Sequence, residues 1–377
     1  MTKILFITHD TSRSGAPFVL LYFLKWLKKN YSEVNFSVVT LKGGSLADEF
    51  KTITDNFYEI EKYEKKAIGL KEKIKEKIYS KFCHQDINRK KNTLLRKLAN
   101  GEFDFIYANT VVSIPLACEI KEMNKKNKIV AHIHELNTVI KILLPDLSRY
   151  IPKIDGFIAV SNLVKQDLIR TFDIPTGKIK LVYEYIEPLT ISQKNNKIFT
   201  VGGCGNVDWR KGYDIFIQVA RYIEIYQPRA KIEFVWVGNF TSKEKIVIDA
   251  DLEKADLQGN VFFVGEQKDR EKYFSKFDIF LLPSREDPFP LVALEMGMLG
   301  KPIVCFENAT GIVEVIKGGG GAIVPYLDVK GMAEQVLYYF DNKNKTEEDG
   351  KLAHKVFSHY ITENIAPQLF EYLKKLN

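Results

Sequence analysis

Short apolar runs alternate with longer stretches of helical spacing along most of the chain. After a first run at residues 3–8, such runs occupy 35–41, 103–108, 128–133 and 156–160, and later 231–238, 261–264, 279–282, 302–306 and 322–324. Runs of this length between helical patterns predict parallel strands joined by right-handed helical crossovers. The fold class is therefore α/β.

The same opening unit occurs twice. Residues 3–8 lead into a small polar loop at 12–17 and a helical pattern at 18–27, and residues 197–201 lead into 202–212 and a helical pattern at 213–225. A strand, a small-residue loop and a helix form the start of a doubly wound sheet. Two Rossmann-like domains are expected, at 1–190 and 197–359, with a polar break at 188–196.

The last residues, 360–377, have the spacing of an amphipathic helix, with Ile361, Ile365, Leu369 and Leu373 on one face. This helix follows the last strand–helix unit of the second domain. We expect it to cross back and pack on the first domain.

Composition places the chain among ordinary globular proteins, with 45% hydrophobic and 27% charged residues. Its 377 residues favour two domains. We expect neither a signal peptide nor a membrane-spanning helix, because every apolar run is short. The four cysteines lack metal-ligand spacing, which indicates a reduced, cytoplasmic chain.

An acidic motif, residues 284–295, follows the apolar run at 279–282. Pro288 and Pro290 favour an extended turn, with a helix beginning near Leu291. The free N–H groups of that first turn suit a phosphate or a sugar hydroxyl. Asp287 and Glu295 lie eight residues apart and can converge on one ligand across the loop. The alternative is two exposed acids beside a proline turn.

A basic motif lies in the glycine-rich segment 202–212. Arg210 and Lys211 precede Gly212 and a helix, so they can neutralise a diphosphate. The alternative is a solvated Arg-Lys pair. A dinucleotide fingerprint for hydride transfer is poorly supported, because Asp208 stands where the third glycine would be.

Four residues of the first half lie at or after the ends of predicted strands. Gly15 follows the first strand and lets the backbone approach a diphosphate, although a plain tight turn has the same composition. His132 and His134 share one face of the strand at 128–133. No third metal ligand is evident, and packed histidines are the usual alternative. Asn109 follows the strand at 103–108.

Together these motifs resemble the family 4 glycosyltransferases, the group 1 glycosyl transferases of bacterial polysaccharide biosynthesis, whose GT-B fold has two Rossmann-like domains facing across a cleft. The resemblance is strongest at 200–322. It implies that Glu295 holds the donor ribose, that Asp287 contacts the transferred sugar, and that the backbone of Phe289, Pro290, Leu291 and Val292 meets the sugar and diphosphate. The family usually has Glu and Gly in place of Asp287 and Pro288, which leaves the sugar contacts less defined than the ribose contact.

The same resemblance implies further contacts. Lys211 and Gly212 match the diphosphate loop, where Asn206 replaces a common arginine and Arg210 is expected to supply the missing charge. His134 matches a histidine that contacts the donor sugar. The remaining implied sites are the diphosphate turn at Gly15, the base-binding loop at Gly265 and Glu266, and the acceptor side at Asn109.

The implied reaction is retaining transfer of a hexose, glucose-like by expectation, from a nucleotide-sugar that is UDP-linked by family frequency. The acceptor is a saccharide or lipid-linked saccharide in exopolysaccharide synthesis. No hydrolase-like nucleophile is evident, so a front-face route assisted by the leaving diphosphate fits better. No metal or other cofactor is expected, because Arg210 and Lys211 stabilise the diphosphate. The Asp249-Ala-Asp251 motif lies in a helical, charged stretch and is interpreted as a solvated face.

Charge is concentrated at residues 62–97, which hold thirteen Lys or Arg against four acids. Leu70, Ile74, Ile78 and Phe82 repeat every four residues among lysines. Such a helix can dock on an anionic membrane, which would place the protein peripherally on the inner face of the membrane. It can equally pack on its own domain. Nucleic acid is not expected, because interleaved aromatic residues are few.

Rival functions remain open at this level. A nucleotide-sugar epimerase or a phosphorylase can use the same two-domain fold, and a phosphorylase would need lysine-bound pyridoxal. A non-catalytic relative would bind the nucleotide-sugar without turnover.

Overall fold

The computed structural model describes residues 2–63, 89–189, 198–267 and 269–376. The chain divides into two compact units. The N-terminal unit comprises Met1–Val160, Val164–Val182 and Ile365–Asn377, and the C-terminal unit comprises Ser161–Leu163 and Tyr183–Asn364. The division after Val182 precedes the polar stretch 188–196.

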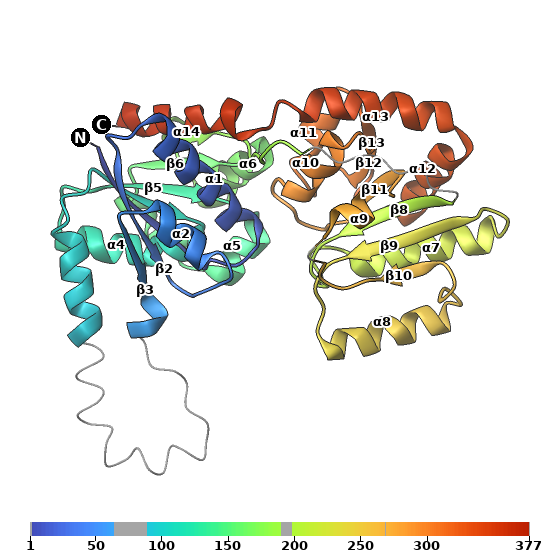
Figure 1. Ribbon diagram of the computed structural model, residues 1–377, viewed down its shortest axis with the longest axis horizontal. Helices are drawn as coiled ribbons and strands as arrows, with labels where there is room; N and C mark the ends of the chain where they lie inside the picture. The colour runs from blue at the N-terminus through green and yellow to red at the C-terminus, as the bar shows by residue number, and fades with distance from the viewer. Residues whose placement is uncertain (1, 64–88, 190–197, 268, 377) are drawn as a thin grey trace, which may run out of the picture. The chain divides into compact units, whose positions relative to one another are not determined.

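Among its described residues, the N-terminal unit contains a seven-stranded sheet in the order β3-β2-β1-β4-β5-β6-β7, and every neighbouring pair is parallel (Figure 1). The strands are β1 (Lys3–Thr8), β2 (Asn35–Thr40), β3 (Asn56–Glu59), β4 (Phe105–Asn109), β5 (Lys128–Ile133), β6 (Gly156–Ala159) and β7 (Ile179–Leu181). The helices are α1 (Gly15–Asn30), α2 (Ala47–Ile53), α4 (Ile114–Met123), α5 (Asn137–Leu143) and α6 (Asn162–Phe172), and residues 89–99 are also helical. Short 3-10 turns are Ile60–Tyr63, Val111–Ser113, Leu147–Arg149, Ile151–Lys153 and Thr176–Lys178.

In its described residues, the C-terminal unit contains a six-stranded parallel sheet in the order β10-β9-β8-β11-β12-β13. The strands are β8 (Phe199–Cys204), β9 (Ile232–Val237), β10 (Val261–Phe263), β11 (Ile279–Leu282), β12 (Ile303–Phe306) and β13 (Gly321–Val324). The helices are α7 (Tyr213–Tyr226), α8 (Ser242–Lys254), α9 (Glu271–Phe274), α10 (Leu291–Met298), α11 (Val313–Ile316), α12 (Val329–Asp341) and α13 (Lys343–Phe357). The last helix, α14 (Thr362–Leu376), begins in this unit and belongs to the N-terminal unit from Ile365 onward.

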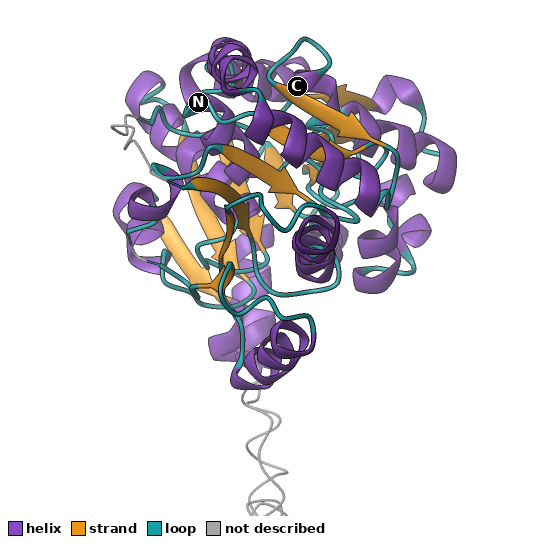
Figure 2. Cartoon of the chain, turned by 90° about the vertical axis from the view of Figure 1, so that its right-hand side faces the viewer, coloured by secondary structure: helices purple, strands orange, loops and turns teal. Residues whose placement is uncertain are grey.

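Helices cover the strands of the C-terminal sheet, as Figure 2 shows in purple and orange. In β11, Ile279 and Leu281 join an apolar cluster with residues of α7 and α12, while Phe280 and Leu282 are equally buried outside that cluster. Successive side chains of a strand point to opposite faces, so both faces of β11 are covered. The sequences of the strands are therefore nearly continuous apolar runs, as expected for a parallel sheet covered on both faces.

The strands predicted from apolar runs are confirmed, with ends within two residues of the predicted ones except at β8. The first glycines of the 202–212 segment, interpreted from the sequence as loop, belong to β8. A Cβ at Gly202 would lie 2.1 Å from the Phe277 ring, and one at Gly203 would lie 2.5 Å from the Trp236 ring. These two glycines make room for aromatic rings, and the loop begins only at Gly205.

The last helix crosses back to the N-terminal unit, as predicted, because α14 from Ile365 onward belongs to that unit. The Phe370 ring lies 4.5 Å from the Tyr31 ring and 6.5 Å from the Trp26 ring. The Tyr372 hydroxyl donates a hydrogen bond to the Lys178 carbonyl at 3.1 Å. Figure 1 shows this helix, in red, along the N-terminal unit.

Replacing Phe370 with alanine should lower the free energy of unfolding of the N-terminal unit by about 3–5 kcal/mol, because a buried ring leaves a cavity. Denaturant unfolding checks this. The matched control is Phe262→Ala, since Phe262 is 38% exposed whereas Phe370 is 3% exposed. Equal losses of unfolding free energy in the two variants would show that the packing of α14 on the N-terminal unit does not depend on the Phe370 ring.

Candidate functional site

The strand order of the C-terminal sheet reverses between β8 and β11. Parallel sheets bind ligands beyond the carboxyl ends of their strands, at such a reversal. The two loops that follow these strands are residues 205–212, after β8, and residues 283–290, after β11. They contain the basic and acidic motifs predicted from the sequence.

Asp287 joins the two loops through a buried ion cluster. Its Oδ2 atom lies 2.6 Å from Lys211 Nζ and its Oδ1 atom 3.3 Å from Arg210 Nη1. Ser284 Oγ donates to Oδ2 at 3.2 Å. The Asp287 side chain is 5% exposed, against 14% for Lys211 and 31% for Arg210. The cations therefore lie toward solvent and the carboxylate lies behind them.

The charge state of Asp287 follows from this geometry. Burial alone would raise the pKa of its carboxyl, but Lys211, then Arg210, and the hydrogen bonds from Lys211 and Ser284 hold the pKa below its ordinary value. Asp287 is thus an anion that fixes two cations. The sequence motif predicted these three residues near one ligand, and the structure brings them together.

Arg285 joins the same two loops through an ion pair and a hydrogen bond. The sequence analysis did not predict this role. Its Nη1 and Nη2 atoms bind Asp214 Oδ1 and Oδ2 at 2.9 and 2.7 Å, and Nη1 also donates to the Trp209 carbonyl at 2.8 Å. A bidentate ion pair of this kind fixes the orientation of the guanidinium as well as its distance from the carboxylate. The signal available in the sequence was the position of Arg285 beside the acidic motif, directly after a strand.

Gly212 is required where the basic motif enters α7. Its φ of +70° is left-handed, and an added Cβ would lie 2.0 Å from the Pro283 carbonyl oxygen. Gly238, after β9, is similarly confined, since a Cβ there would lie 1.9 Å from the Gly205 carbonyl oxygen. These close approaches hold the loop after β8 against both neighbouring strands.

The acidic motif ends in helix α10. Phe289 is buried, with its ring 5.1 Å from that of Tyr183, and Pro290 has the extended conformation of a helix N-cap. Leu291 and Val292 form the first turn and are partly exposed. The N–H groups of a first turn have no partner within the helix, so this end can receive an anion.

Glu295 lies one turn further along α10. Its Oε1 atom accepts from Arg270 Nη2 at 3.2 Å, and its Oε2 atom is buried with no hydrogen-bond partner among the described residues. Burial raises the pKa of Glu295, and the Arg270 charge opposes that rise. A buried carboxylate oxygen without a partner is costly unless a ligand satisfies it.

The other predicted donor-side residues occupy neighbouring loops. Asn206 is exposed in the loop after β8. Gly265, with φ +74°, follows β10, and its carbonyl accepts from the Gly238 amide at 3.1 Å. Glu266 is exposed beside it.

In the N-terminal unit the strand order reverses between β1 and β4. Asn109, the last residue of β4, is fully buried, and its Nδ2 donates to the Ala16 carbonyl at 3.1 Å. Its Oδ1 lies 3.0 Å from His134 Nε2, so that nitrogen is the donor. Gly15, the first residue of α1, is exposed beside Ala16. Asn109 therefore orients His134 and the start of α1 together.

Other polar residues complete this edge and were not singled out from the sequence. Glu135 Oε2 accepts from the amides of His134 and Val111 at 3.0 and 3.3 Å, which fixes the loop after β4. His9 follows β1, and burial lowers its pKa. His9 could have been noticed because, like His134, it directly follows a strand.

His132 is a packed histidine. It is 2% exposed, with Nδ1 2.6 Å from the Tyr107 hydroxyl, and its ring lies 4.0 Å from that of His134. Burial, followed by the charge of His134, lowers the pKa of His132 well below its usual range. His132 is therefore neutral, and its ring packs against the ring of His134.

The Asp249-Ala-Asp251 motif lies in α8, as predicted. Asp249 is exposed and pairs with Lys245 at 2.7 Å. Among the described residues, no group of three or more His, Cys, Asp or Glu is arranged to hold a metal ion.

The apolar stripe of the basic segment, Leu70 to Phe82, lies outside the described residues. Within the described parts of the chain, no helix combines the length and hydropathy needed to cross a bilayer.

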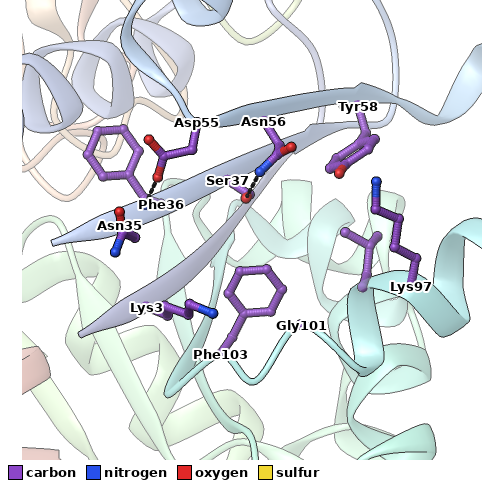
Figure 3. Close-up of a pocket in the computed structure, with 11 residues that line it drawn as sticks. Lys3, Asn35, Phe36, Ser37, Asp55, Asn56, Tyr58, Lys97, Gly101 and Phe103 are labelled. Carbon is purple, nitrogen blue, oxygen red and sulfur yellow. Dashed lines mark hydrogen bonds between the residues drawn. The ribbon is translucent and has the colours of Figure 1, made fainter. Parts of the chain in front are cut away.

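A cavity of about 420 Å³ lies at the opposite edge of the N-terminal sheet, where β1 and β2 begin (Figure 3). Its polar groups already bind one another. Asn56 Nδ2 donates to Ser37 Oγ at 3.3 Å, and the Lys97 ammonium lies 5.2 Å from the centre of the Tyr58 ring. The predicted site residues lie at the other edge of this sheet, so we do not assign the cavity to the candidate site.

Asp287→Asn should lower the free energy of unfolding of the C-terminal unit at neutral pH by about 3 kcal/mol, because it leaves two cations without their buried anion. The pKa of Asp287 is depressed, so its contribution is present above the pKa of an unfolded aspartate and is lost as the pH falls through the folded-state pKa. Denaturant unfolding measures the loss.

The control for this prediction is Asp249→Asn, which removes an exposed partner of Lys245. We expect it to cost less than about 0.5 kcal/mol. If both substitutions cost the same, the ion cluster does not hold the loops together.

Two family models match the chain. Residues 195–342 match the model described as Glycosyl transferases group 1, and residues 52–188 match that of Glycosyltransferase Family 4. An O-antigen biosynthesis glycosyltransferase, WclY of Escherichia coli, is 29% identical over 35% of this chain and 38% of its own length. A lipopolysaccharide core biosynthesis mannosyltransferase, LpsB of Rhizobium meliloti, is 27% identical over 38% of this chain and 42% of its own length. The aligned part thus spans less than half of each relative.

Solved structures match over nearly the whole chain. Anabaena Alr3699/HepE, solved with UDP and glucose, has a TM-score of 0.77 at 18% identity and covers 100% of both chains. TarM has a TM-score of 0.76 at 15% identity and covers 99% of both chains. These likenesses establish the fold. Since the two family models describe the two halves in order, and the sheets match those of GT-B structures, the chain belongs to the family 4, group 1 glycosyltransferases and has the GT-B fold.

Proposed function

We propose that this protein transfers a hexosyl group from a nucleotide-sugar to a saccharide or lipid-linked saccharide during synthesis of a cell-surface polysaccharide. The observation that carries the proposal is the cluster of Arg210 and Lys211 on buried Asp287, beside the first turn of α10. Fixed cations and free amides together suit a diphosphate. The relatives named for O-antigen and lipopolysaccharide core synthesis support the acceptor class.

The donor is a UDP-sugar with a glucose-like hexose in this proposal. Support comes from HepE, which was solved with UDP-glucose. Glu295 Oε2, which has no partner among the described residues, accepts hydrogen bonds from the ribose hydroxyls. The amides of Leu291 and Val292 and the loop at Phe289 and Pro290 meet the diphosphate and sugar, and Gly265 and Glu266 lie on the side of the base.

The reaction breaks the bond between the anomeric carbon and the diphosphate oxygen. An acceptor hydroxyl oxygen forms the new bond to that carbon on the same face, and its proton passes to the departing diphosphate. Arg210 and Lys211 stabilise the negative charge that develops there. These two cations take the electrostatic role that a divalent metal has in other transferases, so no metal or other cofactor is proposed.

Asp287 acts mainly by holding these cations, since both of its oxygens are engaged. A carboxylate behind the cations keeps Lys211 and Arg210 in place before the donor arrives. Asp287 also contacts the transferred sugar in this proposal. That contact requires the Lys211 side chain to turn from Asp287 toward the diphosphate.

His134 contacts the donor sugar in this proposal, with its ring fixed by Asn109 and its backbone by Glu135. Asn109 is fully buried, so it influences the acceptor side through His134 and the start of α1 at Gly15. Residues 62–97 would bring the protein to the cytoplasmic face of an anionic membrane, where a lipid-linked acceptor lies.

Three other functions fit a similar fold. An epimerase would act on the sugar without a saccharide acceptor. A phosphorylase would use phosphate and would show pyridoxal absorbance. A non-catalytic relative would bind UDP-glucose but neither transfer nor hydrolyse it. We favour the transferase because the matching family models and the named relatives are glycosyltransferases.

UDP-glucose at about 100 times its Kd should raise the stability of the C-terminal unit by about 2.7 kcal/mol. Lys211→Ala and Arg210→Ala should each weaken binding, and should lower turnover or slow hydrolysis by about a hundredfold, because each removes a charge at the leaving group. Thermal-shift titration across nucleotide-sugars and a UDP-release assay check both effects.

Lys245→Ala is the control for losing a positive charge outside the candidate site, because Lys245 is exposed on α8 and pairs with Asp249. It should change neither binding nor turnover. No stabilisation by any nucleotide-sugar would contradict the donor class, and unchanged UDP release in both site variants would contradict the role of the cations.

A further inference from the structure

Glu295 is held unequally at its two carboxylate oxygens. Arg270 Nη2 donates to Oε1 at 3.2 Å, whereas Oε2 is buried and has no hydrogen-bond partner among the described residues. The Glu295 side chain is 13% exposed and that of Arg270 is 44% exposed. The guanidinium therefore reaches the carboxylate from the solvent side and fixes one oxygen only.

Arg270 is itself fixed in place. It precedes α9 in helical backbone geometry, and its carbonyl accepts from the amides of Tyr273 and Phe274, each at 3.0 Å. Its guanidinium carbon lies 5.6 Å from the centre of the Phe274 ring. Arginine stacked on an aromatic ring has few ways to arrange its donors. The direction of the Arg270–Glu295 contact is thus set by α9.

We propose that Arg270 is a positioning residue for the nucleotide-sugar: by binding Glu295 Oε1 it turns Oε2 toward the ribose hydroxyls of the donor. This inference rests on the proposed function, in which Glu295 binds the ribose. It adds a second role for the segment after β10, beside Gly265 and Glu266 on the side of the base.

Arg270 also favours the charged form of Glu295. Burial raises the pKa of Glu295, and Arg270 is the cation that lowers it. On β8, the Cys204 thiol interacts electrostatically with Glu295; its pKa is raised to about 12, first by burial and then by Glu295, so it stays neutral. Lys211 and Asp287 are paired with each other. Among the described groups, Arg270 alone binds the Glu295 carboxylate directly.

Removing Arg270 therefore raises the pKa of Glu295 further. A protonated carboxyl has lost acceptor capacity for hydroxyl groups, so donor affinity falls as the pH falls through that pKa. In Arg270→Ala this loss begins at a higher pH than in the wild-type protein. A contact that only stabilised the fold would change melting temperature and not the pH dependence of binding.

The experiment measures the Kd of UDP-glucose by calorimetry at about pH 8 and about pH 6, where its diphosphate diester does not titrate. We expect the affinity of Arg270→Ala to fall about tenfold more than that of the wild-type protein between these values. Arg270→Lys keeps the charge without the planar fork, so it should restore most of the wild-type pH dependence.

Arg270→Ala/Glu295→Gln is the matched control, because glutamine has no titrating carboxyl. Its affinity should be low and should not vary with pH. Melting temperatures at about pH 8 should agree among the variants, since a partly exposed pair contributes little to stability.

Two outcomes would overturn the inference. Wild-type affinity and wild-type pH dependence in Arg270→Ala would show that Arg270 does not act through Glu295, while UDP-glucose binding by the wild-type protein would still support the proposed donor. Failure of the wild-type protein to bind UDP-glucose would contradict the proposed donor and the inference with it.

Discussion

Asp287 is a buried carboxylate with a cation on each oxygen, and the loops after β8 and β11 meet through it. A buried charge is tolerated only when it is paired and hydrogen-bonded, so Lys211, Arg210 and Ser284 are all needed. The pairing also confines the two cations to the end of the sheet. Gly212 and the Arg285–Asp214 fork follow from this constraint, since each allows the loops to approach that closely.

The N-terminal unit fixes its polar side chains at the corresponding place through hydrogen bonds. Asn109 joins the end of β4 to α1 and to His134, and Glu135 anchors the loop after β4. Both sheets therefore place fixed polar side chains where their strand order reverses. Hydrogen-bonded amide and imidazole groups suit sugar hydroxyls, whereas the cations of the other unit suit phosphate.

Much of the fold could be predicted from the sequence, because strands buried in a parallel sheet consist of apolar runs. The edge strands β3 and β7 were missed, since Asn56–Glu59 and Ile179–Leu181 are short and only partly buried, with no continuous apolar run. The candidate site was predicted from the loops that follow the strands. Contacts such as Arg285–Asp214 and Arg270–Glu295 were not, because they join residues 71 and 25 positions apart and no local pattern encodes them.

In the proposed function, the Asp287 cluster and the start of α10 receive the donor diphosphate. A crystal structure of the protein with bound UDP would locate that diphosphate. We expect phosphate oxygens within hydrogen-bond distance of Lys211 Nζ and the Leu291 and Val292 amides, with ribose hydroxyls on Glu295 Oε2. UDP bound elsewhere, with Lys211 still held by Asp287 and Glu295 Oε2 without a ligand, would contradict this proposal.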